Sequence, residues 1–304
     1  MAFYGLDIGG TKIETAIFDR NLNILKSWRV DTPTTNYPEF LRVIAQLVEQ
    51  ADSYTGISGK VGIGMPGLIT AKGHLLSANI PCATGKPIRD DINKLLSREI
   101  ALENDTRCFA LSEAINGAGK GYERVFGAII GTGAAGGFCR NGQLDSTAQS
   151  FAGEYGHIPL PADIQIKYNL PIIKCGCGLM ACVENYIAGP GISRLYKHFN
   201  GESISPEQWV VRLKKKEANA EKVLACYLDI LGSTFATLTK FLEPDVIVLG
   251  GGISLISEIV ENLAPAIEKY LFSGFRAPQL KIALHGDSSG VRGAALLGTK
   301  INEN

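Results

Sequence analysis

The sequence predicts an α/β protein with largely parallel sheets, and two observations support that class. Short apolar runs rich in β-branched residues alternate along the chain with segments whose apolar residues recur at helical spacing. Two stretches (3–19 and 124–142) each show a strand, a glycine-rich turn and a second strand, which is the signal of a hairpin. These openings lie about 120 residues apart and form a weak internal repeat on the scale of a domain. With 304 residues, the chain has room for about two domains.

Alternating helices and strands follow the first opening. The segment 37–55 has apolar residues at helical spacing, and 60–67 is a short strand that runs into a Pro-Gly turn. A helix at 88–99 and a strand at 100–104 come next. The following helix, at 105–121, has Asp at its start and glycines at its end, as helix boundaries often do.

The second half repeats this alternation. Its predicted elements are a long helix at 217–242, a strand at 245–252, a helix at 253–271, a strand at 280–286 and a last helix at 289–301. The glycine-rich segment GAGKGYE (117–123) is the expected hinge. We therefore expect a small α/β domain of residues 1–118, completed by the C-terminal helix (about 289–304), and a large α/β domain of residues 119–288.

Composition and charge argue against several classes of function. Lys plus Arg and Asp plus Glu number 30 each, so no global positive field would hold nucleic acid or an anionic membrane. The first residues, MAFYGLDIGGTK, lack the basic and apolar regions of a secretory signal, and no apolar run is long enough to span a bilayer. The expected location is therefore the cytoplasm.

Three glycine-rich turns predict phosphate binding: DIGGTK (7–12), IGTGAAGG (130–137) and VLGGG (248–252). Glycine lets backbone N–H groups approach a ligand, and a run of such groups forms an anion-binding concavity. Asp7, at the end of the first strand, can hold Mg²⁺ directly or through water. The alternative is that these glycines only form tight hairpin turns. Neither the Walker pattern nor a dinucleotide fingerprint is present.

Asp105 is the candidate catalytic carboxylate. It follows Asn104 at the junction between a predicted strand and a predicted helix. An Asp at that position is first of all a helix N-cap. However, the end of a parallel strand is also where α/β proteins bind ligands, and a carboxylate there can accept a proton from an attacking hydroxyl.

The stretch KCGCGLMACVENY (174–186) holds three cysteines in eight residues. A cytoplasmic location argues against a disulfide, and the spacing is not that of a thioredoxin-like pair. The spacing is also tighter than that of a usual zinc-finger hook. Zinc binding is favoured over an iron–sulfur cluster, and a redox site stays open at this point.

Six motifs resemble, in their order and spacing, the ROK family of sugar kinases and repressors: DIGGTK (7–12), ENDTRCFALSEA (103–114), IIGTGAAGG (129–137), GEYGH (153–157), CGCGLMACVE (175–184) and VLGGG (248–252). The resemblance extends over essentially the whole chain, and the motifs together are highly specific. It implies the duplicated sugar kinase/actin-like (ribonuclease H-like) fold, with ATP bound in the cleft between two domains. The repeated hairpin openings agree with that fold.

The resemblance also implies a role for individual residues. Asp105 matches the catalytic base, and Asp7 would position Mg²⁺. The positions expected to bind ATP are Asp7, Gly9, Gly10, Thr11, Lys12, Gly131, Thr132, Gly133, Gly250, Gly251 and Gly252. The positions expected to contact the sugar are Asn79, Asn104, Asp105, Glu154, His157 and Glu184.

The resemblance supplies a fourth ligand for the cysteine cluster. His157 would join Cys175, Cys177 and Cys182 in a closed tetrahedral site, which marks structural rather than catalytic zinc. Such a site would hold the neighbouring sugar contacts at fixed positions.

The chain departs from the family pattern in the second glycine turn. Ala134 and Ala135 stand where the family often has other residues, including glycine. Alanine is strained at positive φ. Either the backbone there has ordinary φ, or the turn has shifted and alters nucleotide packing slightly.

The substrate expectation rests on the same resemblance. Repressors of the family carry a DNA-binding domain ahead of DIGGTK, which here begins at residue 7, so we expect a kinase. The stretches at 78–88 and 153–161 resemble those of bacterial N-acetyl-D-glucosamine kinases. They predict ATP-dependent phosphorylation of N-acetyl-D-glucosamine at its 6-hydroxyl; the alternative is another hexose (fructose, glucose or mannose). A homodimer is expected. Rivals from other classes are a sugar sensor without catalysis and a redox or zinc-binding scaffold.

Overall fold

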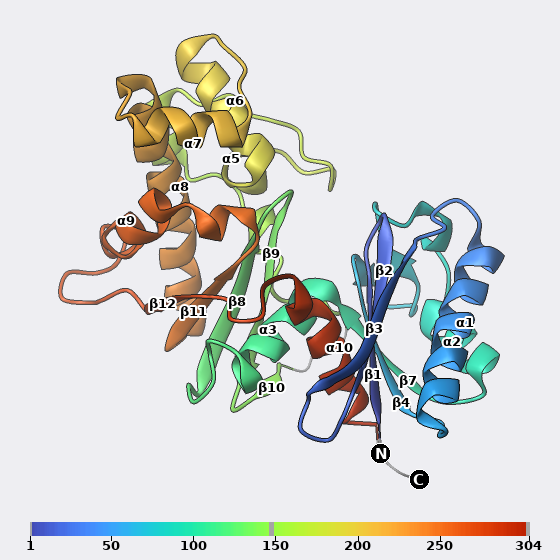
Figure 1. Ribbon diagram of the computed structural model, residues 1–304. Helices are drawn as coiled ribbons and strands as arrows, with labels where there is room; N and C mark the ends of the chain where they lie inside the picture. The colour runs from blue at the N-terminus through green and yellow to red at the C-terminus, as the bar shows by residue number, and fades with distance from the viewer. Residues whose placement is uncertain (1, 146–148, 302–304) are drawn as a thin grey trace. The chain divides into compact units, whose positions relative to one another are not determined.

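The computed structural model describes residues 2–145 and 149–301, which fold into two compact units (Figure 1). The first unit comprises Met1–Lys120, Gly137–Gly153 and His285–Asn304, and the second comprises Gly121–Gly136 and Glu154–Leu284. The boundary after Lys120 lies inside the segment that we expected as a hinge. Residues 137–153 belong to the first unit, whereas we expected them in the large domain. The expected domain bounds as a whole stay a prediction.

The first unit is built on a five-stranded sheet in the order β3-β2-β1-β4-β7. Its strands are β1 (Phe3–Ile8), β2 (Lys12–Phe18), β3 (Ile24–Asp31), β4 (Lys60–Met65) and β7 (Ile100–Asn104). β1, β2 and β3 form an antiparallel meander, while β1, β4 and β7 run parallel. The expected first hairpin and the expected parallel strands are therefore confirmed, whereas β3 was not predicted.

Helices cover both faces of this sheet. They are α1 (Tyr37–Thr55), α2 (Ile88–Leu96), α3 (Asp105–Asn116) and α10 (Ser289–Gly298). Tyr4 and Leu6 of β1 belong to the core that includes α1 and α2, while Phe3 packs against Val291 of α10 on the other face. Alternate residues of a strand point to opposite faces, so Asp7 lies on the α10 side. The short elements β5 (Leu68–Ile69), β6 (Leu75–Leu76) and η1 (Pro81–Ala83) link β4 to α2.

A second five-stranded sheet has the order β10-β9-β8-β11-β12. Its strands are β8 (Arg124–Ile130), β9 (Ala134–Arg140), β10 (Gln143–Leu144), β11 (Val246–Gly250) and β12 (Gln279–Ile282). Ranked along the chain, the strands of both sheets follow the same spatial order of third, second, first, fourth and fifth. This match confirms that the repeated openings mark a duplicated fold.

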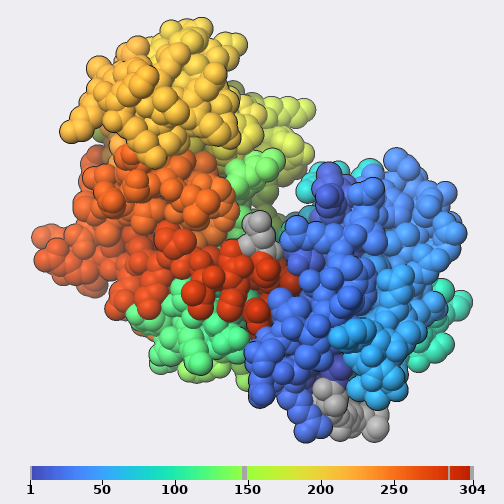
Figure 2. All heavy atoms as spheres, viewed as in Figure 1, coloured from blue at the N-terminus to red at the C-terminus, as the bar shows by residue number. Residues whose placement is uncertain are grey.

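Most helices of the second unit lie in the chain between β10 and β11, and one more lies between β11 and β12. They are α4 (Ala162–Tyr168), α5 (Glu184–Ile187), α6 (Gly189–Asn200), α7 (Pro206–Lys214), α8 (Ala218–Leu242) and α9 (Ser257–Glu268), with short turns η2 (Tyr155–His157) and η3 (Gly252–Leu255). α4 to α7 were not predicted. No helix in the described part of the chain is long and apolar enough to cross a membrane. Within each unit, side chains fill most of the space between the helices and strands (Figure 2).

Several predicted helix boundaries were wrong: α2, α9 and α10 end at Leu96, Glu268 and Gly298 rather than at 99, 271 and 301. Two further differences have a local cause. α3 ends at Asn116 rather than at 121, because its cap residue Gly117 leaves the helical conformation with ψ −150°. α9 begins at Ser257 rather than at 253, because a short 3₁₀ turn follows β11 first.

Glycines let α10 lie directly on its neighbours, which leads to a stability prediction. A Cβ on Gly293 would lie 1.8 Å from the carbonyl oxygen of Cys108 in α3. Gly293→Ala is therefore expected to destabilise the protein by about 3 kcal/mol through overpacking and to lower the Tm by about 10 °C. Gly73→Asn is the control, because no atom lies within 4 Å of its Cβ position and asparagine tolerates its φ of 77°. Equal melting of both variants would contradict this account.

Candidate active site

Asp105 is the first residue of α3, but Asn104 caps the helix. The Asn104 side-chain oxygen accepts the backbone N–H of Thr106 at 2.9 Å and that of Arg107 at 3.4 Å. The Asn104 amide donates to the carbonyl of Gly67 at 3.1 Å. The reading of Asp105 as an N-cap is therefore wrong. Its carboxylate accepts the Thr106 N–H at 2.8 Å and lines a cavity that a ligand can enter.

A cavity of about 310 Å³ in the first unit brings Asp105 together with Asp7. Gly9, Lys12, Glu14 and Arg29 complete its lining. Four of these six residues were expected from their motifs, whereas Glu14 and Arg29 were not. Glu14 and Arg29 are directly opposite in the β2–β3 pairing, and Arg29 Nε donates to Glu14 Oε2 at 2.9 Å. Only the strand register brings Arg29 to this cavity.

The carboxylates of the cavity repel one another. Burial, followed by the charges of Asp105 and Glu14, raises the pKa of Asp7 to about 7. Burial raises the pKa of Asp105 as well. A divalent cation beside Asp7 would relieve this repulsion, and carboxylate oxygens are the ligands that Mg²⁺ prefers. The residues present therefore fit the expected Mg²⁺ site.

The first glycine turn closes tightly. The N–H of Gly9 donates to the carbonyl of Lys12 at 2.8 Å, and Thr32 contacts this turn through the carbonyls of Gly9 and Thr11. Gly10 packs on the backbone of Asn79, whose oxygen would lie 3.1 Å from an added Cβ. Asn79 and Thr11 are exposed. The structure thus brings the expected sugar contact Asn79 next to the expected phosphate turn.

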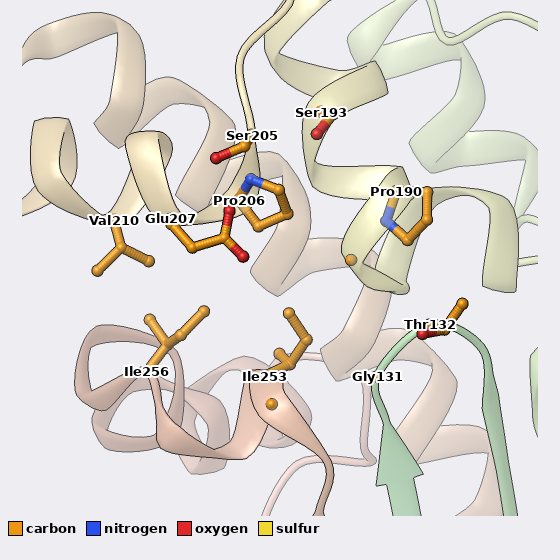
Figure 3. A pocket seen from close by; sticks show the side chains of 12 residues that line it. Gly131, Thr132, Pro190, Ser193, Ser205, Pro206, Glu207, Val210, Ile253 and Ile256 are labelled. Carbon is orange, nitrogen blue, oxygen red and sulfur yellow. The ribbon is translucent and has the colours of Figure 1, made fainter. Parts of the chain in front are cut away.

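A larger pocket, of about 730 Å³, lies in the second unit (Figure 3). Gly131 and Thr132 line it, together with the first residues of α6 and α7. The positive ends of helix dipoles suit an anionic group. Val210, Ile253 and Ile256 also line the pocket, and their apolar side chains suit a flat heterocycle. These side chains and both helix starts were not predicted from the sequence.

The glycines of the second and third turns have different tasks. Gly252 lines the pocket, whereas Gly251 (φ 81°) packs on the Ile130 carbonyl, where a Cβ would come within 2.3 Å. Gly250 ends the buried strand β11. Ala134 and Ala135 begin β9 without positive φ, so the first alternative for these alanines is confirmed.

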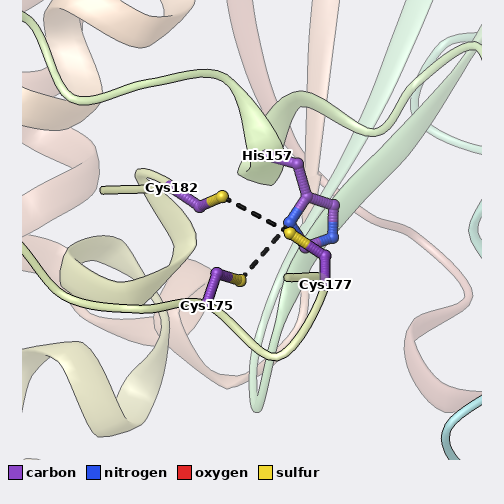
Figure 4. Close-up of side chains that lie close together, drawn as sticks. All are labelled: His157, Cys175, Cys177 and Cys182. Carbon is purple, nitrogen blue, oxygen red and sulfur yellow. Dashed lines mark hydrogen bonds between the residues drawn. The ribbon is translucent and has the colours of Figure 1, made fainter. Parts of the chain in front are cut away.

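His157, Cys175, Cys177 and Cys182 converge in the second unit (Figure 4). Their ligand atoms all lie within 4.8 Å of one another. His157 Nδ1 is 3.7 Å from Cys175 Sγ, and Cys177 Sγ is 3.6 Å from Cys182 Sγ. A tetrahedral site with Zn–S bonds of about 2.3 Å has edges of about 3.8 Å, so these residues fit zinc.

The expected sugar contacts are divided between the units. Asn79, Asn104 and Asp105 belong to the first unit. Glu154, His157 and Glu184 belong to the second unit. Glu154 Oε2 lies 3.6 Å from His157 Nε2, the ring nitrogen that does not face the cysteines. His157 can therefore bind a metal through Nδ1 while Nε2 remains available.

The motifs and the two sheets agree with comparisons to known proteins. Residues 3–301 match the ROK family. The chain belongs to the ROK family. It is 46% identical over 296 residues to the N-acetylgalactosamine kinase of Shewanella sp. (strain ANA-3), covering 97% of this chain and 96% of that protein. It is 41% identical over 298 residues to the N-acetyl-D-glucosamine kinase of Salmonella newport (strain SL254), covering 97% and 98%.

Solved structures of ROK proteins share the fold. The ROK hexokinase of Thermus thermophilus matches with a TM-score of 0.86 at 32% identity, covering 98% of this chain and 97% of that one. The ROK family glucokinase of Streptomyces griseus, solved with glucose and AMPPNP, matches with a TM-score of 0.76 at 25% identity, covering 98% and 99%. The expected sugar kinase/actin-like fold is therefore confirmed.

Proposed function

We propose that this ROK family protein transfers the γ-phosphoryl group of ATP to the 6-hydroxyl of an N-acetylated hexosamine, with N-acetyl-D-glucosamine as the first candidate. Kinases of N-acetylgalactosamine and of N-acetyl-D-glucosamine, each similar over nearly the full chain, favour an amino sugar over a plain hexose. The observation that carries the chemistry is the pairing of Asp105, which has no capping task, with Asp7 in one cavity.

The proposed mechanism assigns proton transfer to Asp105. Its raised pKa makes the carboxylate a better proton acceptor for the sugar hydroxyl as that oxygen attacks phosphorus. Asp7 would hold Mg²⁺, which neutralises charge on the β- and γ-phosphates when bound. Lys12 and Arg29, in the same cavity, add positive charge near the reacting group.

The nucleotide is proposed to occupy the pocket of the second unit. Gly131 and Thr132 would meet the phosphates, and Ile253 and Ile256 would lie against the adenine. Glu154, His157 and Glu184 are proposed to bind sugar hydroxyls, with zinc holding His157 in place. Free thiols in the metal cluster suit a reducing compartment, so we propose a cytoplasmic location. Separately, we propose that the protein forms a homodimer.

The experiment that tests this function is an ATP-dependent assay over a panel of sugars. We expect kcat/KM for N-acetyl-D-glucosamine or N-acetylgalactosamine to exceed that for glucose, mannose and fructose by about 100-fold, because a site built for an acetamido group leaves polar atoms unpaired with a plain hexose. ADP release coupled to pyruvate kinase and lactate dehydrogenase gives the rates. Equal turnover of glucose would favour the plain-hexose alternative, and sugar binding without ADP release would favour the sensor.

A further inference from the structure

The loops that carry the metal ligands approach the second glycine turn from both sequence segments, and their main contacts are with Ala134. Glu184 Oε2 accepts the Ala134 N–H at 2.9 Å. Gly156 packs on the other side of the same peptide chain, where an added Cβ would lie 2.1 Å from the Ala134 carbonyl oxygen. Gly156 directly precedes His157, and Glu184 follows Cys182 by two residues. The metal cluster and the glycine turn are thus joined through two short links.

The turn itself leaves little room for movement. The Gly131 N–H donates to the Gly133 carbonyl at 2.9 Å, and the Gly131 carbonyl accepts the N–H of Gly189 at 2.8 Å. An added Cβ on Gly133 would lie 2.8 Å from Glu184 Oε2. Gly133 lacks positive φ, and the Glu184 carboxylate lies close against it, so a larger residue there would push the carboxylate away from the Ala134 N–H.

The linking segments are firmly anchored. Tyr155 is 2% exposed, and its hydroxyl donates to the carbonyl of Ile129, next to the turn, at 2.8 Å. Its ring packs edge-on against Phe126 and Phe235. The two ligand-bearing segments also pair with each other, through a bridge between Pro159 and Cys182. Movement of either segment would therefore displace the turn.

We propose that Glu184 and Gly156 are positioning residues for the phosphate turn and set the affinity for nucleotide independently of sugar. The Glu184 carboxylate accepts the N–H of Ala134, and Gly156 leaves room for the Ala134 carbonyl, so the backbone N–H groups of Thr132 and Gly133 keep the orientation that phosphates need. Glu184 thus serves the nucleotide in addition to the sugar role implied by the family. The inference rests on the proposed function, because it takes the 730 Å³ pocket to bind ATP.

The test measures ATP affinity without sugar, by isothermal titration calorimetry with Mg²⁺-AMPPNP, together with zinc per chain and Tm. We expect Gly156→Ala and Glu184→Ala to weaken AMPPNP binding by about 10-fold or more while zinc stays bound. Glu184→Gln is expected to lose less, because its amide oxygen can still accept the Ala134 N–H. The matched control is Gly176→Ala in the metal loop, where an added Cβ meets no atom within 4 Å.

Failure of the positioning role and failure of the proposed function give different results in these measurements. If Gly156→Ala and Glu184→Ala bind AMPPNP as the unchanged protein does and only the sugar KM rises, the positioning role is overturned. If the unchanged protein binds no AMPPNP, the proposed function itself fails. Should Gly156→Ala not fold, the pair Glu184→Ala and Glu184→Gln decides, because neither adds an atom beside the turn.

Discussion

Asp105→Asn is expected to lower kcat by about 10³-fold while sugar binding largely survives. Loss of a general base removes proton transfer from the attacking hydroxyl, a contribution of about 10²- to 10⁴-fold. The helix start should persist, because Asn104 and not Asp105 caps α3. The rate is measured by ADP release at saturating ATP and sugar, and sugar affinity by calorimetry.

A matched variant separates this effect from the general effect of removing one negative charge at a helix start. Asp90→Asn alters an exposed acid in the first turn of another helix of the same unit, α2, and should leave kcat unchanged. Near-normal turnover of Asp105→Asn would remove Asp105 from the base role. A fall in Tm similar in size to that of a core variant would point to a folding defect instead.

Cys177→Ser is expected to release zinc and to lower the Tm by about 10 °C. Ligation by thiolates contributes free energy directly to folding, so loss of one ligand weakens both metal binding and the loops that the metal joins. Sugar binding should weaken although Cys177 contacts no proposed sugar atom, because His157 and Glu184 lose their support. Zinc is measured by atomic emission on the purified protein.

The control for this variant is Cys82→Ser. Cys82 is half-buried in the first unit, far along the chain from the ligands, and its Sγ lies 3.5 Å from the Pro33 carbonyl, which a serine hydroxyl can also bond. The Cys82→Ser variant should keep one zinc ion per chain. Purified, unchanged protein without zinc would refute the structural-metal account.

Local patterns were sufficient for most of the strands and helices of the two sheets, although β3 was not predicted. α1 was predicted at its observed bounds, Tyr37–Thr55, because its apolar spacing and its Asn36 cap act within a few residues. The segment between 162 and 214 was not predicted. There α6 begins with Gly189 and Pro190, a pair that resembles a turn in the sequence although proline also suits the first turn of a helix.

The candidate site shows the same division. The glycine turns, Asp7, Asp105 and the metal ligands could be named from their motifs, because each motif is a short run of chain. Arg29 and Glu14 could not, because they reach the cavity only through strand register. The helix starts beside Gly131 were likewise invisible, since nearly 60 residues separate Gly131 from Gly189 in the sequence.

The sequence by itself determined the duplicated α/β fold and the family, and it named the candidate residues for the chemistry. The tertiary structure alone decided which neighbour caps α3 and so leaves Asp105 available. It also decided that Glu184 contacts the second glycine turn at Ala134, 50 residues earlier in the chain. The physical reason is that capping and hydrogen bonding require two atoms to lie about 3 Å apart. Which atoms reach that distance depends on the folded backbone, and a sequence pattern does not show it.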